Sequence, residues 1–142
     1  MLQAALDSGA AAEQFGRMVA ALGGPKKFVD DPWKHMEVAP LTVAIHPGRA
    51  GTVQHIDTRA VGMVVVALGG GRTRPQDPVD HAVGLTWLAG LGEHVGPDRP
   101  LAIVHARTDA QVQQATALLQ AAYRLSGKAA TAQAAVLDRI TA

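Results

Sequence analysis

Apolar residues in this chain come in short runs, and most runs stop at glycine or proline. The clearest run lies at residues 10–22, where large side chains recur at the spacing of one helix face. Its apolar stripe consists of Ala11, Phe15, Met18, Val19 and Leu22. A Gly-Gly-Pro sequence follows at residues 23–25. Glycine tolerates the left-handed conformation at a helix C-terminus and proline cannot continue the ladder, so we expect the helix to end there.

Two β-rich runs follow, at residues 41–46 and 52–56. Between them lies the sequence Pro-Gly-Arg-Ala-Gly, which supplies turn chemistry with two glycines. The sequence therefore predicts a β-hairpin in which residues 41–46 pair with residues 52–57.

The next segment carries a helix signal at both ends. Asp57 or Thr58 can cap its start, and three glycines at residues 69–71 can close it. Its buried stripe would be Val61, Val64, Val65 and Leu68. A run this rich in valine and methionine also suits a strand, so propensity leaves both structures open.

The same signals, apolar spacing and capping or turn residues, predict the remaining elements. We expect an irregular helical segment at 27–31, a loop at 72–80, strands at 82–88 and 100–106, a helix capped by Asp109 and ending at Gly127, a connector at 129–135 and a short strand at 136–140.

Length and composition exclude several classes of protein. A chain of 142 residues suits one domain or part of a larger one, and no apolar run approaches the roughly 20 residues that a bilayer requires. With no cysteine, disulfide frameworks and thiolate metal sites are excluded. A net charge of +1 is too small for the phosphate attraction behind nucleic-acid binding. The first residues show no signal-peptide pattern, so we expect a cytoplasmic protein with neither membrane nor nucleic acid as partner.

Three blocks of sequence, in register, resemble the thymidine (pyrimidine-nucleoside) phosphorylase family. The first is Ala-Ala-Glu-Gln-Phe-Gly-Arg-Met-Val-Ala-Ala-Leu-Gly-Gly-Pro at residues 11–25. The second joins residues 57–63 to 67–72, and the third joins residues 80–84 to 91–92. Their order and spacing are similar to the C-terminal third of that family.

The resemblance implies an α/β (α+β) fold with an α/β-hammerhead C-terminal domain. Residues 1–31 would be the helical end of the preceding phosphate-binding subdomain, residues 32–40 a linker, and residues 41–142 the C-terminal domain. By the same resemblance the whole enzyme is a homodimer with its site in a cleft between a helical and an α/β domain.

The family resemblance also implies an activity, the reversible conversion of thymidine and phosphate to thymine and 2-deoxyribose 1-phosphate. Phosphate is held by Lys, Ser and Thr near a Gly-rich loop, and the base by Arg, Ser and Lys with a nearby His. All of these motifs precede the matched region, and the chain has no counterpart of the Ser-Gly-Arg-Gly-Leu-Gly-His-Thr-Gly-Gly signature. We therefore expect no catalytic, substrate-binding or metal residue here, no cofactor, and a missing N-terminal portion as partner.

Several residues invite a site interpretation. Residues 69–71 with Arg72 could hold a phosphate through backbone amides, but a helix C-terminus repels anions, which favours a structural cap. No two histidines have a metal-ligand spacing on one helix. His46 and His55 could face each other across the expected hairpin. Asp80 and His81 are the pair most worth inspecting for a ligand, with surface hydrogen bonding as the simpler account.

The aromatic residues are too sparse for a base-stacking platform, so we expect them to serve core and edge packing. They are Phe15, Phe28, Trp33, Trp87 and Tyr123. The basic group at residues 72–74 is typical of a solvated loop.

A second function class is a stand-alone hammerhead module related to biotinyl and lipoyl carriers. A carrier needs a lysine at its hairpin tip for covalent attachment. The expected tip carries Arg49 instead, which disfavours this hypothesis.

The stripe of the first helix generates a prediction, because by the resemblance it packs partly on a missing subdomain. One large exposed side chain forfeits roughly 1.5–3 kcal/mol, so the stripe should fold back on the chain or be covered by a second copy. We expect Phe15→Asp to lower the melting temperature or change the mass measured by light scattering at several concentrations. A monomeric wild-type chain, with both quantities unchanged in the variant, would contradict this.

Overall fold

A computed structural model describes residues 2–127 and divides the chain into two compact units, with the boundary between Val38 and Ala39. The connector predicted at 129–135 and the strand predicted at 136–140 lie outside the described residues.

The N-terminal unit is helical, with α1 at Leu2–Asp7, α2 at Ala10–Ala21 and a short 3-10 helix η1 at Pro32–Lys34. The predicted first helix is confirmed in α2, and Gly23 takes the left-handed conformation that ends it. The irregular helix expected at 27–31 is wrong, because turns occupy residues 26–30 and the 3-10 helix begins only at Pro32. Proline suits a first helical position, where its missing N–H costs no hydrogen bond.

The stripe of α2 has little cover within this unit. Phe15 meets Phe28 edge-on, with ring centroids 6.2 Å apart, but it is still 45% exposed. Met18 is 49% exposed and Leu22 81% exposed. The apolar face predicted from the periodicity therefore exists and needs a partner beyond α2 and the turn that follows it.

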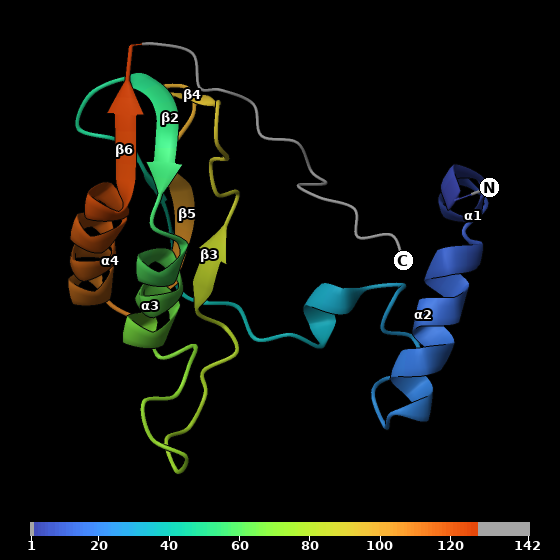
Figure 1. Ribbon diagram of the computed structural model, residues 1–142. Coiled ribbons are helices and arrows are strands. Elements are labelled where there is room, and N and C mark those ends of the chain that lie inside the picture. Colours follow the sequence, from blue (N-terminus) through green and yellow to red (C-terminus); the bar gives the residue numbers. More distant parts are fainter. Residues whose placement is uncertain (1, 128–142) are drawn as a thin grey trace, which may run out of the picture. The chain divides into compact units, whose positions relative to one another are not determined.

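Up to residue 127, the C-terminal unit contains two three-stranded antiparallel sheets and two helices (Figure 1). One sheet has the order β1-β5-β3, and the other has the order β4-β2-β6. The strands are β1 Leu41–Ile45, β2 Gly51–Ile56, β3 Gly84–Thr86, β4 His94–Val95, β5 Ala102–Ala106 and β6 Tyr123–Ser126. The predicted mixed α/β class is confirmed.

The predicted hairpin is wrong. β1 pairs with β5, from Leu41 opposite Ala106 to Ile45 opposite Ala102, whereas β2 pairs with β4 and β6. The two runs therefore belong to different sheets. Gly51 lies where β2 approaches β6 closely, because an added Cβ there would come within 3.1 Å of the Ser126 carbonyl oxygen. This glycine makes room for β6 beside β2.

Helix α3, Thr58–Leu68, settles the segment that propensity left open. The Asp57 side chain accepts a hydrogen bond from the Ala60 amide at 2.9 Å, which satisfies a free donor of the first turn. Val64 and Leu68 are buried. The predicted helix and its Asp57 cap are thus confirmed, and two of its four stripe residues, Val64 and Leu68, lie in the core.

Helix α4 spans Asp109–Ala122, shorter than predicted. Its cap is Thr108 rather than Asp109, in a capping box with Gln111. The chain then becomes extended at Tyr123 and enters β6, so the predicted helix is confirmed but its predicted end at Gly127 is wrong. Pairing of β6 with β2 outweighs the helical spacing of this segment.

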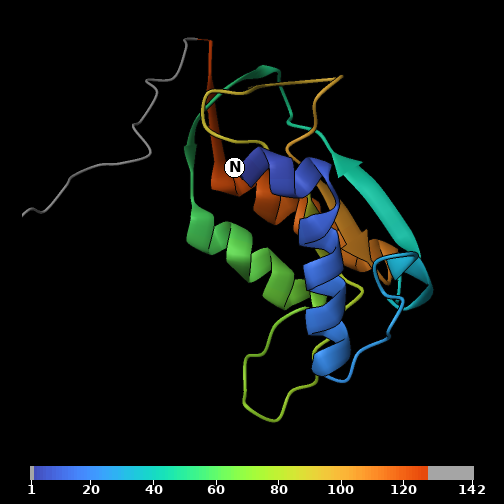
Figure 2. The ribbon, with the colours of Figure 1, turned by 90° about the vertical axis from the view of Figure 1, so that its right-hand side faces the viewer.

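Helices α3 and α4 pack side by side, and together with both sheets they enclose the core (Figure 1 and Figure 2). The largest fully buried side chains are Val53, Val64, Val95, Leu101, Val104 and Leu119. The strand expected at 82–88 shortens to β3, and sequence reasoning missed α1, β4 and β6.

Two adjacent leucines of α4 test this core. Leu119 is fully buried and Leu118 is 39% exposed. Leu119→Ala removes packed methyl groups and leaves a cavity, so it should lower the free energy of unfolding by about 2–5 kcal/mol. Leu118→Ala should change it by about 0.5 kcal/mol or less. Urea unfolding of both variants measures the difference, and equal effects would contradict the assigned burial.

Candidate functional site

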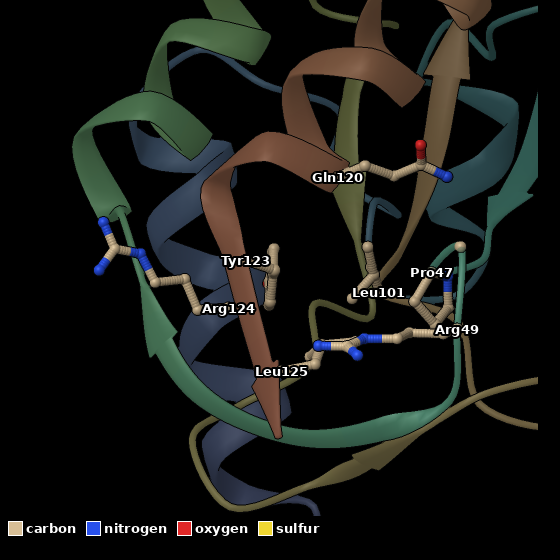
Figure 3. A pocket seen from close by; sticks show the side chains of 8 residues that line it. Pro47, Arg49, Leu101, Gln120, Tyr123, Arg124 and Leu125 are labelled. Carbon is tan, nitrogen blue, oxygen red and sulfur yellow. The ribbon is translucent and has the colours of Figure 1, made fainter. Parts of the chain in front are cut away.

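A groove of about 460 Å³ lies where the turn after β1 meets the end of α4 and β6 (Figure 3). Leu101 and the ring of Tyr123 form a buried apolar floor. The full lining is Pro47, Gly48, Arg49, Leu101, Gln120, Tyr123, Arg124 and Leu125. The sequence had marked Pro47, Gly48 and Arg49 as part of a turn, but it gave no sign that this turn meets Leu101 and Tyr123 in a groove.

Most polar groups of the groove serve the fold. Gln120 Nε2 donates to the His46 carbonyl oxygen at 2.9 Å, and the Tyr123 hydroxyl donates to the Ala89 carbonyl oxygen at 3.1 Å. Burial raises the pKa of Tyr123, which keeps the phenol neutral. Arg49 reaches across the groove toward Leu125, while Arg124 points to the other side of β6 (Figure 3). The groove thus offers one guanidinium above an apolar floor and holds no acid–base pair.

Asp80 forms a bidentate ion pair with Arg107, with Nε–Oδ2 at 2.8 Å and Nη2–Oδ1 at 2.9 Å. This hydrogen bonding to Arg107, then the bond from the Ala82 amide, lowers the pKa of Asp80 from 3.8 to about 2. The Asp80 amide also donates to the Gly69 carbonyl oxygen. The residue singled out for a possible ligand is therefore engaged in joining the end of α3 to the start of α4.

The glycine run after α3 closes that helix. Gly69 has φ +96°, and its amide and that of Gly70 donate to carbonyl oxygens of the last turn. The loop that follows is folded on itself. The carboxylate of Asp77 accepts from the Thr73 hydroxyl at 2.7 Å and from the Arg74 amide and guanidinium. These bonds, Thr73 first, lower the pKa of Asp77, and the predicted cap and solvated loop both fit this geometry.

The histidines do not gather. Nδ1 of His46 lies 2.8 Å from the Gly96 carbonyl oxygen, and His55 lies on β2 opposite Arg124, so the two do not face each other. His105 bridges β5 and β3, with Nε2 2.8 Å from the Thr86 hydroxyl. Within residues 2–127 no three His, Cys, Asp or Glu side chains form a group able to hold a metal ion.

The two tryptophans are more exposed than the expected core and edge packing implies. Trp33 is 71% exposed and Trp87 is 55% exposed, whereas Tyr123 is buried as expected. The guanidinium of Arg99 lies 4.4 Å from the centre of the Trp87 ring. Sequence reasoning missed this pair, because the two residues stand twelve positions apart in a segment that gives no periodic signal.

The family model of the pyrimidine nucleoside phosphorylase C-terminal domain matches residues 52–126. The chain belongs to this family. Over 136 residues it is 48% identical to a thymidine phosphorylase of Burkholderia lata. The match takes in 96% of this chain but 31% of that relative, so the chain spans about a third of the relative's length. The suspected resemblance to the phosphorylase C-terminal portion is thereby confirmed.

The Asp80–Arg107 pair of this phosphorylase domain predicts a pH dependence. A lowered folded-state pKa means that the carboxylate stabilises the fold above about pH 3.8, and that this contribution is lost as the pH falls toward about 2. Asp80→Asn should therefore destabilise the chain near neutral pH, with the difference from wild type shrinking over that acid range. Urea unfolding across pH measures it, with the exposed Asp98→Asn as control. A wild-type–variant difference constant down to pH 2 would contradict the pairing.

Proposed function

We propose that this chain is the C-terminal portion of a thymidine phosphorylase and supports the enzyme without supplying its catalytic groups. The complete enzyme would be a pentosyltransferase of pyrimidine metabolism, converting thymidine and phosphate to thymine and 2-deoxyribose 1-phosphate. One observation carries the proposal, the 48% identity to the Burkholderia lata enzyme across 96% of this chain.

The proposed division of labour follows from the side chains of the described residues. Among the described residues, the carboxylates whose pKa is lowered are engaged in structural bonds: Asp80 with Arg107, Glu93 with Arg99, and Asp77 within its own loop. Catalysis needs groups aimed at the charge that develops in the transition state. We assign phosphate and nucleoside binding to the portion of the enzyme outside this chain, and no catalytic, substrate-binding or metal residue to the chain itself.

The domain arrangement is part of the proposal. Residues 1–31 would complete the preceding phosphate-binding subdomain, residues 32–40 would be the linker, and residues 41–142 the C-terminal domain. The exposed face of α2 supports this assignment, because Met18 and Leu22 lack cover in their own unit. A homodimer of the complete enzyme and a cytoplasmic location belong to the same proposal. None of the helices among the described residues has the length and apolar character to cross a membrane.

The carrier hypothesis is not favoured. A carrier requires a lysine at the attachment turn, and the turn after β1 presents Arg49. In addition, β1 and β2 enter different sheets, so residues 47–50 do not form the tip of a hairpin.

The proposal predicts a split activity. The chain alone should release no thymine from thymidine and phosphate. Co-expression with the portion of the Burkholderia lata enzyme that lies outside the match should raise thymine release above that of either part alone. Chromatographic assay of thymine measures it, with phosphate omitted as the control. Phosphate-dependent thymine release by the purified chain alone would contradict the division of labour.

A further inference from the structure

The segment that joins β3 to β4 displays three exposed apolar side chains within five residues of sequence. Trp87 is 55% exposed, Leu88 41% and Leu91 51%. In Figure 1 this segment runs along the side of the unit opposite α4. Other exposed apolar residues of the unit, such as Met63 on α3 and Leu118 on α4, stand singly on helices, as is normal for a protein surface.

The backbone of this segment is held in an unusual conformation. Trp87 has φ +50°, and it is the one non-glycine residue with positive φ among residues 2–127. A bulky side chain in the left-handed region is strained and persists only where the surroundings impose it. Such outliers gather at binding and functional sites, so their presence on an exposed surface calls for an explanation by function.

Arg99 imposes the conformation from one side. Its Nη1 donates to the Trp87 carbonyl oxygen at 2.9 Å, and its Nη2 donates to the Leu88 carbonyl oxygen at 3.2 Å. The guanidinium also stacks on the Trp87 ring and pairs with Glu93 at 2.7 Å. Glu93 balances the charge of Arg99, so the role of Arg99 is to hold the indole of Trp87 in place.

Tyr123 fixes the same segment from the protein interior, because its hydroxyl donates to the Ala89 carbonyl oxygen. The apolar side chains are therefore displayed on a loop that is already ordered. Pre-ordering lowers the entropy lost on association, and tryptophan and arginine are enriched among the residues that dominate binding energy.

We propose that the loop of Trp87, Leu88 and Leu91 is a docking surface for the rest of the phosphorylase chain, with the indole entering an apolar recess of that portion. The inference rests on the proposed function. The occupant is inferred from length, since about two thirds of the Burkholderia lata relative lies outside the match and would be the neighbour of this domain in the complete enzyme. The strained Trp87 buries little of its apolar surface within its own unit, where it is 55% exposed.

The test uses the 142-residue chain and, as the probe, the purified portion of the Burkholderia lata enzyme outside the match. Trp87→Asn removes the indole but keeps a residue that tolerates the left-handed conformation, so the loop should retain its shape. Leu118→Gln is the matched control, an exposed apolar residue on another face. Calorimetric titration gives the dissociation constants, thermal unfolding checks that each variant is folded, and light scattering gives the mass of each chain alone.

We expect Trp87→Asn to weaken binding at least tenfold and Leu118→Gln to leave it unchanged. Tight binding by wild type with no loss in a folded Trp87→Asn variant overturns the docking surface while leaving the proposed function intact. Failure of the wild-type chain to bind the probe overturns both. A wild-type dimer that becomes monomeric in Trp87→Asn assigns the loop to a second copy and also overturns the proposal.

Discussion

The pairing of β5 with β1 on one edge and β3 on the other is the contact on which the C-terminal unit depends. It joins the start of the unit, at Leu41, to Ala106, just before α4 begins. Val104 and Ala102 of β5 are fully buried, so the strand is both the centre of a sheet and a wall of the core. Once β5 is in place, α4 follows directly and carries the chain back to β6 beside β2.

Local chemistry was sufficient to predict elements whose signals lie within one segment. Helix α3 has its cap at Asp57 and its left-handed glycine at Gly69, and both could be recognised from the sequence. The hairpin failed because strand partners are set by contacts far along the chain, and a Pro-Gly-Arg-Ala-Gly turn is equally suited to a crossing between sheets. Gly51 resembled a turn residue, yet its role is to let the backbone of Ser126 approach.

The candidate sites differ in the same way: features set by neighbouring residues could be predicted, and features set by distant residues could not. The cap function of Gly69 was predictable because helix ends have local rules. The groove beside Arg49 was not predictable, since its floor combines Leu101 with Tyr123, residues that lie far apart in the sequence. The ordering of the Trp87 loop was likewise hidden. Its determinants are the guanidinium of Arg99 and the hydroxyl of Tyr123, and neither spacing corresponds to a helical or strand period.

The position of β1 also bears on where this family's domain can be cut. The family match begins at residue 52, whereas the partner of one β5 edge is β1, Leu41–Ile45. A shortened chain that started at the match would keep β5 but leave that edge with unpaired amides and carbonyls. Open edges recruit strands from other molecules. Trimming to the matched residues would thus replace an internal partner by an intermolecular one and favour self-association.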